Sequence, residues 1–299
     1  MSLVADEIRD QPRAWSQAIE LGASAVGALP AGERVAVTGC GSSWHAAKAL
    51  AALRELGGAG ETDAFSASEA RLDRGYDRVV AISRSGATTE ILRALERVRA
   101  GTPTVAVVGD PASPVAVGCD DVIDLSFADD RSVVQTRFVT TVVCFARAAL
   151  GLEVGALVAD AEGALVAPHP AGAEAIDRAV VLGREWRVGL AEAAALTLRE
   201  TAGLWAESYP AMEYRHGPIA TAGPGALVWL LDPPPDRLAE QIAATGANVV
   251  EASLDPLAEL VRIQRLAVAI AEQRGLDPDQ PAHLERAVVL DLIESGGAP

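Results

Sequence analysis

The stretch Arg34-Val-Ala-Val-Thr-Gly-Cys-Gly-Ser-Ser43 decides the fold of this chain. A short β-branched run ends in two glycines, and a helical pattern follows from about residue 43 to 57. This order is typical of a strand that passes through a tight turn into the N-terminus of a helix. The order then repeats, with a predicted strand at 77–82, the turn Ser83-Arg-Ser-Gly-Ala-Thr88 and a predicted helix over 88–100.

The same alternation extends through the rest of the sequence. Short buried strands that alternate with helices indicate parallel sheets covered on both faces, so we predict an α/β fold. The predicted strands cover residues 34–38, 77–82, 104–108, 121–125, 179–182, 226–231 and 248–251. Further helices are predicted over 132–150, 188–207 and 256–273, and residues 1–30 are predicted to be helical with an interruption at Pro12.

The length of 299 residues suits about two domains of ~150 residues, each able to bury a core. An Ala- and Gly-rich stretch with a second strand–Gly–helix pattern after it marks the boundary. We expect an N-terminal helical segment (1–30), a first domain (31–155), a linker (156–176), a second domain (177–290) and a C-terminal tail (291–299).

Composition excludes several classes of function. The formal net charge is −16, from 25 Lys and Arg against 41 Asp and Glu, and such a field repels nucleic acid. No apolar run approaches the ~18 residues of a membrane span, and acids stand where a signal peptide needs a basic region. The three cysteines lack metal-ligand spacing. We therefore expect a cytoplasmic protein with no nucleic-acid or membrane partner, no metal and no redox cofactor.

The two turns after the first two strands are rich in glycine and hydroxyl groups. Because ligands of α/β sheets bind where strands end and helices begin, these turns suit a phosphate group. Gly39-Cys-Gly41 starts like a dinucleotide-binding motif, but Trp44 stands at the last glycine position, which disfavours NAD, and no Walker sequence occurs. For either turn alone, a simple helix cap is the better interpretation, whereas two such turns favour phosphate. The candidate phosphate ligands are Ser42, Ser43, Ser83, Ser85 and Thr88.

Six motifs, in this order along nearly the whole chain, resemble those of the sugar-isomerase (SIS) domain family. The resemblance is strongest to the tandem-SIS isomerase half of glucosamine-6-phosphate synthases and to related deglycases. It implies two flavodoxin-like α/β/α sandwiches, a sugar phosphate as small-molecule partner, and a homodimer with shared active sites. The motifs are Cys40-Gly-Ser-Ser43, Ser83-Arg-Ser-Gly-Ala-Thr88, 133–141, Arg199-Glu200, Ser208-Tyr-Pro-Ala-Met-Glu-Tyr-Arg-His-Gly-Pro218 and Asp277-Pro-Asp-Gln-Pro281.

The resemblance also implies two catalytic residues. Glu200 would move a proton between C1 and C2 of the sugar, and His216 of the neighbouring subunit would help to open the ring. A carboxylate and an imidazole suit these tasks, because aldose–ketose interconversion passes through an enediol. Taken singly, Glu200 is better explained as an exposed helix carboxylate beside Arg199, and the alternative for His216 is a loop residue or helix cap. Their joint placement in matching motifs favours the catalytic roles.

Several positions depart from the synthase pattern. The lysine that forms an imine aligns with Arg286, which cannot form one, and a second active-site lysine aligns with Thr197. Gln135 replaces a serine, and Arg84 replaces a glutamine in the second turn. Arg84 would place a cationic fork at the phosphate, with a surface salt bridge as the alternative. We predict that Val133, Gln135 and Arg286 contact the rest of the substrate.

These departures narrow the expected activity. The loss of both lysines argues against amide-nitrogen transfer. Because position 2 is Ser2 and not the cysteine nucleophile of a glutaminase domain, we expect that glutamine is not the amine donor within this chain. We expect an isomerase or deglycase that acts on a hexose 6-phosphate or an amino derivative of one. The alternatives are a non-catalytic phosphosugar sensor and the isomerase subunit of a separate glutaminase. The sugar and the direction of the reaction stay open.

Overall fold

The computed structural model describes residues 2–25 and 29–290 and contains two parallel sheets. The first sheet has the strand order β2-β1-β3-β4-β5, and the second has the order β7-β6-β8-β9. The α/β class with two parallel sheets is therefore confirmed. The first sheet consists of β1 (Val35–Gly39), β2 (Thr62–Ser66), β3 (Arg78–Ser83), β4 (Thr104–Val108) and β5 (Asp121–Asp124). The second consists of β6 (Arg178–Gly183), β7 (Trp205–Pro210), β8 (Ala226–Leu230) and β9 (Asn248–Glu251).

The alternation of side chains along the strands gives each sheet two buried faces. On β1, Val35 and Val37 face one layer of helices, and Ala36 faces the other. The outer layer of the first sheet is α4 (Thr89–Leu95) and α5 (Pro114–Val117), and that of the second sheet is α9 (Leu238–Ala243).

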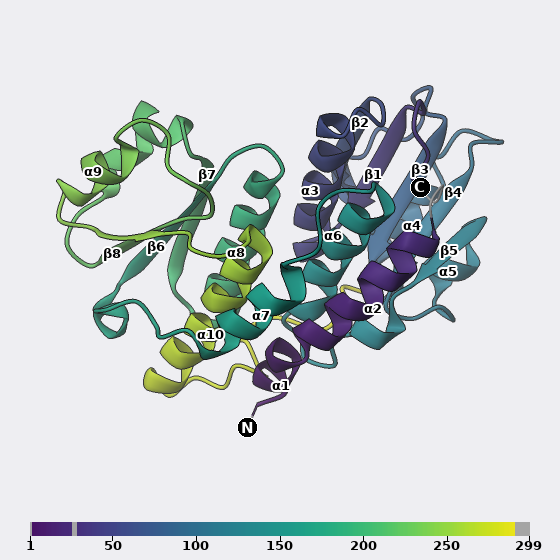
Figure 1. Ribbon diagram of the computed structural model, residues 1–299. Coiled ribbons are helices and arrows are strands. Elements are labelled where there is room, and N and C mark those ends of the chain that lie inside the picture. Colours follow the sequence, from purple (N-terminus) through teal and green to yellow (C-terminus); the bar gives the residue numbers. More distant parts are fainter. Residues whose placement is uncertain (1, 26–28, 291–299) are drawn as a thin grey trace, which may run out of the picture.

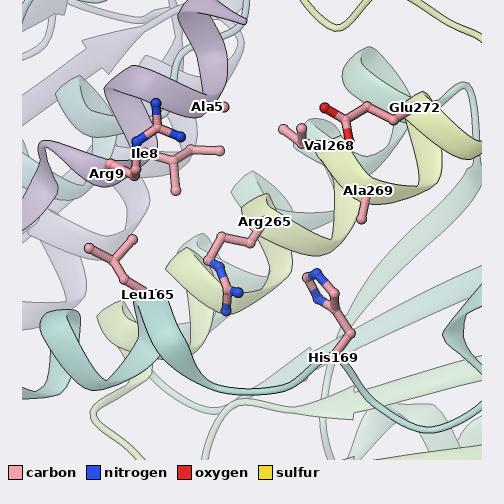
Figure 2. Close-up of a pocket in the computed structure, with 9 residues that line it drawn as sticks. All are labelled: Ala5, Ile8, Arg9, Leu165, His169, Arg265, Val268, Ala269 and Glu272. Carbon is pink, nitrogen blue, oxygen red and sulfur yellow. The ribbon is translucent and has the colours of Figure 1, made fainter. Parts of the chain in front are cut away.

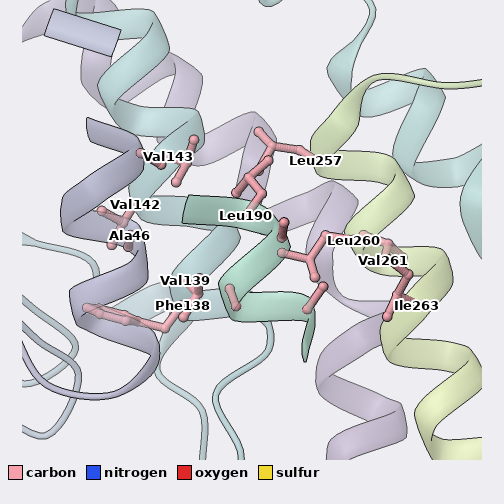
Figure 3. Close-up of a cluster of buried hydrophobic side chains, with 14 of the residues drawn as sticks. Ala46, Phe138, Val139, Val142, Val143, Leu190, Leu257, Leu260, Val261 and Ile263 are labelled. Carbon is pink, nitrogen blue, oxygen red and sulfur yellow. The ribbon is translucent and has the colours of Figure 1, made fainter. Parts of the chain in front are cut away.

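The inner layers of both sheets share one continuous core. The helices α3 (Ser42–Leu56), α6 (Arg137–Ala149), α8 (Arg187–Ala202) and α10 (Pro256–Gln273) lie between the sheets (Figure 1). Side chains from all four interdigitate, with Phe138 and Val142 beside Ala46, and Leu190 beside Leu260 (Figure 3). Separate rigid halves would not share a core of this kind.

Three further helices pack against the inner helices and not directly on a sheet: α1 (Leu3–Arg9), α2 (Gln11–Ser24) and α7 (Leu157–Val166). A buried polar network joins α2 to α6 and α10. The Gln11 amide donates to Gln264 Oε1 at 2.7 Å, and Gln264 donates to the Thr136 carbonyl at 3.2 Å. The Thr140 hydroxyl donates to Gln11 Oε1 at 2.7 Å and accepts from the Trp15 indole at 3.0 Å. Because these groups are buried, each bond avoids an unsatisfied polar atom.

The structure differs from the predicted elements in several places: the short helices α5 and α9 were not predicted, and α4 ends at Leu95 rather than near residue 100. The edge strands β2 and β7 were not predicted, and β7 replaces the last turns of the helix expected over 188–207. Helix α7 lies inside the segment expected to be a linker, and α6 begins at Arg137 rather than near 132. The expected tail 291–299 lies outside the described residues. In residues 2–25 and 29–290, no helix is long and apolar enough to span a membrane.

Candidate active site

A cavity of about 160 Å³ lies at the carboxyl edge of the first sheet. It is bounded by the turns after β1 and β3, by the last turn of α8 and by the chain segment after α10. The cavity therefore collects residues that are up to about 250 positions apart in the sequence. Its walls are Cys40, Gly41, Ser42, Arg84, Thr88, Val133, Gln135, Glu200, Leu284, Glu285, Arg286, Ala287 and Val288.

The first turn requires its glycines. A Cβ on Gly39 would lie 2.6 Å from the backbone carbon of Ser43, so only glycine allows this approach of strand to helix. Gly41 has φ +53° and precedes the first turn of α3. Ser42 lines the cavity, whereas the Ser43 hydroxyl donates to Gln135 Oε1 at 3.2 Å. Ser42 and the start of α3 thus face the ligand space, and Ser43 positions Gln135.

In the second turn, most of the hydroxyls stabilise the loop itself. The Ser83 hydroxyl accepts a hydrogen bond from the Gly86 amide at 3.1 Å, and the Ser85 hydroxyl accepts one from the Ala87 amide at 3.3 Å. Thr88 lines the cavity. Of the predicted phosphate ligands, the structure therefore places Ser42 and Thr88 in the cavity wall and shows the other three in supporting bonds.

The Arg84 guanidinium does not extend freely into the cavity, and it does not form a salt bridge at the surface. Its side chain is only 2% exposed, and its guanidinium donates to the carbonyls of Asp130 (3.1 Å), Ser132 (2.5 Å) and Arg286. Burial lowers the pKa of Arg84, and the carboxyl of Asp130 opposes that shift. Arg84 therefore contributes positive charge to the cavity wall while it fastens two other segments.

The segment after α10 closes one side of the cavity. The Thr89 amide, at the start of α4, donates to the Val288 carbonyl at 3.1 Å, and the Leu290 amide donates to the Thr89 hydroxyl at 2.9 Å. The Arg286 guanidinium pairs with Asp129 at 2.6 Å and also donates to the Asp130 carbonyl. Arg286 thus lines the cavity, but its charge is partly neutralised by Asp129.

Asp129 and Asp130 are supporting residues that the sequence analysis missed. Asp130 is fully buried, and its carboxylate accepts hydrogen bonds from the amides of Thr136, Arg137 and Phe138 at 3.1–3.2 Å. It therefore caps the N-terminus of α6, which explains why that helix begins late. Burial, reinforced by the nearby Glu7, raises the pKa of Asp130 to about 7. The two consecutive acids a few residues before the predicted helix were the available sequence signal.

Glu200 lies in the last turn of α8 and reaches the cavity from the second half of the chain. Burial raises the pKa of its carboxyl to about 7, although the charges of Arg199 and Arg84 oppose the shift. A carboxyl group with a pKa near neutrality can both accept and donate a proton at physiological pH.

A second cavity, of about 500 Å³, continues from Glu200 on the other side of the α8 terminus. Its walls are mainly apolar, from Leu196, Leu276 and Leu284, and the Arg199 side chain stands at its edge. Arg199 donates to the Ala206 carbonyl at 2.6 Å, and no carboxylate among the described side chains lies at ion-pair distance from it. Glu200 therefore separates a small polar space from a larger apolar one.

His216 is exposed in the short helical turn Glu213–His216 and lines neither cavity. One chain therefore does not bring His216 to Glu200. Val133, Gln135 and Arg286 do line the polar cavity together with Glu200. Cys40 lines it too, but burial raises the pKa of the Cys40 thiol to about 11, so the thiol stays protonated at neutral pH.

An ionic cluster holds the helix of the first turn against the helix of Glu200. Glu192 on α8 accepts from Lys48 Nζ at 2.7 Å and lies 3.0 Å from His45 Nδ1, and both of these partners are on α3. Lys48 also lies 4.1 Å from the centre of the Trp44 ring. These two partners lower the pKa of Glu192 against the effect of its burial. The cluster therefore fixes α3 and α8, and with them the two sides of the polar cavity.

In the described part of the chain, no group of three or more His, Cys, Asp or Glu side chains could hold a metal ion.

No family model matches this chain. Its sequence is 28% identical over 87% of its length to a glutamine–fructose-6-phosphate aminotransferase (isomerizing) of Methanothermobacter thermautotrophicus. It covers 52% of that protein, so the chain spans about half the length of the curated relatives it matches. The isomerizing aminotransferase of Xylella fastidiosa is also 28% identical, with 95% of this chain and 58% of that protein covered.

Solved structures share the fold. The glucosamine-6-phosphate deaminase structure from Thermotoga maritima superposes with a TM-score of 0.80 at 24% identity, covering 97% of this chain and all of that one. The C-terminal domain of the glucosamine–fructose-6-phosphate aminotransferase from Francisella tularensis gives a TM-score of 0.73 at 20% identity, covering 94% and 98%. The chain thus resembles the isomerase part of these aminotransferases.

Proposed function

We propose that this chain, which resembles the SIS-domain phosphosugar isomerases, is a phosphosugar isomerase or deglycase. Its substrate is a hexose 6-phosphate or an amino derivative of one. The observation that carries the proposal is that the Glu200 carboxyl shares a cavity of about 160 Å³ with Ser42 and Thr88, the side chains at two helix-forming turns. A phosphate bound by these turns and the carboxyl of Glu200 would share this one small space.

In this proposal the start of α3 and the turn around Thr88 hold the phosphate. Backbone amides and hydroxyls at helix N-termini bind anions without a dedicated lysine, and Arg84 adds a positive charge that water does not screen. Binding at this end fixes the far carbons of the sugar beside Glu200. The carboxylate then takes the proton from one carbon and returns it to the next, so the same residue serves as base and acid.

Ring opening is assigned to His216 of a second copy, on the strength of the resemblance alone. The exposed position of His216 leaves it accessible to another chain. The homodimer with shared active sites is thus part of the proposal. It predicts that an inactive Glu200 variant and an inactive His216 variant regain activity when they are mixed and allowed to exchange subunits.

The larger cavity favours an N-substituted substrate over a plain hexose phosphate. A sugar phosphate bound in the polar cavity leaves about 500 Å³ of mainly apolar space open beside Glu200. A substituent on the sugar nitrogen would occupy that space, and Arg199 would face an acidic end of it. In a deglycase, proton transfer gives an imine, which water then hydrolyses to the free sugar phosphate and the amine.

Deuterium incorporation tests the proposal. The protein is incubated in D₂O with fructose 6-phosphate and with its amino-sugar and amino-acid derivatives, and C1 and C2 are followed by NMR. We expect exchange with at least one substrate, loss of exchange in Glu200→Gln, and no effect of Glu162→Gln on the exposed face of α7. If no deuterium is incorporated with any of these substrates, the proposal that the chain is an enzyme is refuted.

The same experiment separates the alternatives. A phosphosugar sensor would show saturable thermal stabilisation by ligand without exchange. A subunit of a separate glutaminase would retain a glutaminase partner in a pull-down and would need it for amino-sugar formation.

A further inference from the structure

A cavity of about 310 Å³ lies away from the candidate active site, between α1, the end of α7 and α10 (Figure 2). None of its wall residues belongs to either cavity at Glu200. The walls are Ala5, Ile8, Arg9, Leu165, His169, Arg265, Val268, Ala269 and Glu272.

One part of this cavity is apolar. Ile8 is 2% exposed and belongs to the main core, and Val268 also belongs to that core. Leu165 comes from α7 and packs against the same core. In Figure 2, Leu165 and Ile8 face the space from the side opposite Val268 and Ala269. A short hydrocarbon chain would find contacts on both sides.

The other part is cationic. Arg265 donates from one nitrogen to the carbonyls of Ala164 and Ala167, both at 2.7 Å, so its guanidinium is fixed at the end of α7. Among the side chains that the structure describes, no carboxylate forms an ion pair with it. His169 extends toward Arg265 in Figure 2.

The local potential at this end is positive even though the chain is acidic overall. Burial lowers the pKa of His169, and the charges of Arg265 and Arg262 lower it further. The other two charged residues of the wall are Arg9 and Glu272. Arg9 pairs with Asp6, and Glu272 lies apart from His169 in Figure 2, on the other side of Ala269.

We propose that this cavity binds a small amphipathic monocarboxylate. The carboxylate contacts Arg265 and His169, and the hydrocarbon part lies against Ile8, Leu165 and Val268. A single negative charge matches one fixed guanidinium with an imidazole beside it. The apolar wall distinguishes this ligand from an inorganic anion.

Hexanoate serves as the probe, and His169 is the reporter. The chain has four histidines, so their ring signals can be assigned by single substitutions. We expect hexanoate to shift the His169 signals saturably and to raise the pKa of His169, because a bound carboxylate stabilises the imidazolium. Hexanol and inorganic phosphate, each with half of the proposed chemistry, are expected to bind at least about tenfold more weakly.

Two variants complete the test. Arg265→Gln removes the charge and is expected to weaken hexanoate binding by about tenfold or more. Because it also removes a cap of α7, Ala269→Leu provides a second variant that fills the cavity and leaves Arg265 in place. Loss of hexanoate binding in Ala269→Leu, with an unchanged melting temperature, supports the site. Undiminished binding in that variant, or equal binding of hexanol, overturns the proposal, whatever the deuterium-exchange activity.

Discussion

Replacement of Gly189 by alanine is expected to destabilise the protein and to disturb the active site. Gly189 lies on the face of α8 that packs against α3. A Cβ at this position would lie 2.5 Å from the His45 carbonyl oxygen, 2.8 Å from the Ala49 amide nitrogen and 3.2 Å from the Ala49 Cβ. The two shortest contacts involve backbone atoms, which cannot rotate away. The helices themselves would have to separate.

Two opposing effects set the magnitude. Alanine has a higher helix propensity than glycine by about 1 kcal/mol, which favours the variant. Overpacking of a close helix contact costs about 1–3 kcal/mol, and here the first two neighbours are rigid, so we take the upper end of that range. The net loss in the free energy of unfolding should be about 2 kcal/mol.

Gly163→Ala is the matched control. Gly163 lies inside α7, and a Cβ there would meet no atom within 4 Å. The same substitution should therefore stabilise the protein by about 0.5–1 kcal/mol, since only the helix propensity changes.

Thermal unfolding measures both effects. About 2 kcal/mol corresponds to a fall of roughly 4 °C or more in melting temperature, whereas the control should rise by a degree or two. Deuterium exchange provides a second readout, because separation of α3 from α8 moves Ser42 relative to Glu200. A melting temperature that rises in Gly189→Ala as it does in Gly163→Ala would refute the close contact and the reasoning built on it.

Four further predictions concern charged groups. Glu200→Gln should stabilise the fold more at pH 8 than at pH 5. Burial raises the pKa of Glu200 in the folded protein to about 7, against 4.5 for the free side chain, so the wild type loses stability as the pH rises between those values. Urea midpoints of both proteins at the two pH values test this. The deuterium-exchange rate of the wild type should rise with pH through about 7, as the carboxylate forms. Glu192→Gln should lower the free energy of unfolding by about 1–2 kcal/mol, because Lys48 and His45 lose the carboxylate that both contact. An unchanged urea midpoint would contradict this. In Arg84→Lys, the single ammonium group cannot donate to all three carbonyls that the guanidinium contacts, so the segment after α10 should be held less firmly. Hydrogen exchange of the Thr89 amide should therefore accelerate, and unchanged protection would show that Arg84 does not hold this segment.

Much of the fold could be predicted because its central strands are short β-branched runs. The two strands that were missed are both at sheet edges. β2, Thr62-Asp-Ala-Phe-Ser66, contains an acid and little β-branching, and β7 ends in Pro210 after a helical pattern. An edge strand tolerates such residues because one side is unpaired. The left-handed Gly203, which ends α8, was the local signal for β7.

The candidate site was predictable in its parts but not in its connections. The glycines and hydroxyl groups after β1 and β3 point to an anion site because strand ends meet at one edge. Which hydroxyl faces the cavity depends on the turn geometry, and that geometry uses Ser83 and Ser85 for internal bonds. The role of Arg84 depends on carbonyls about 46 to 202 residues away, and such contacts leave no local pattern in a sequence.

The hydrogen bond between Gln11 and Gln264 joins two segments that are synthesised at very different times. The ribosome makes Gln11, Trp15 and Thr140 long before α10, yet Gln264 on α10 supplies the acceptor for the Gln11 amide. In a nascent chain that holds the complete first sheet but lacks α10, one hydrogen of this amide is without its acceptor, while the amide still donates to the Ile8 carbonyl at 3.3 Å. Translation stalled just before residue 256 should leave α2 sensitive to protease, and release of the finished chain should protect it.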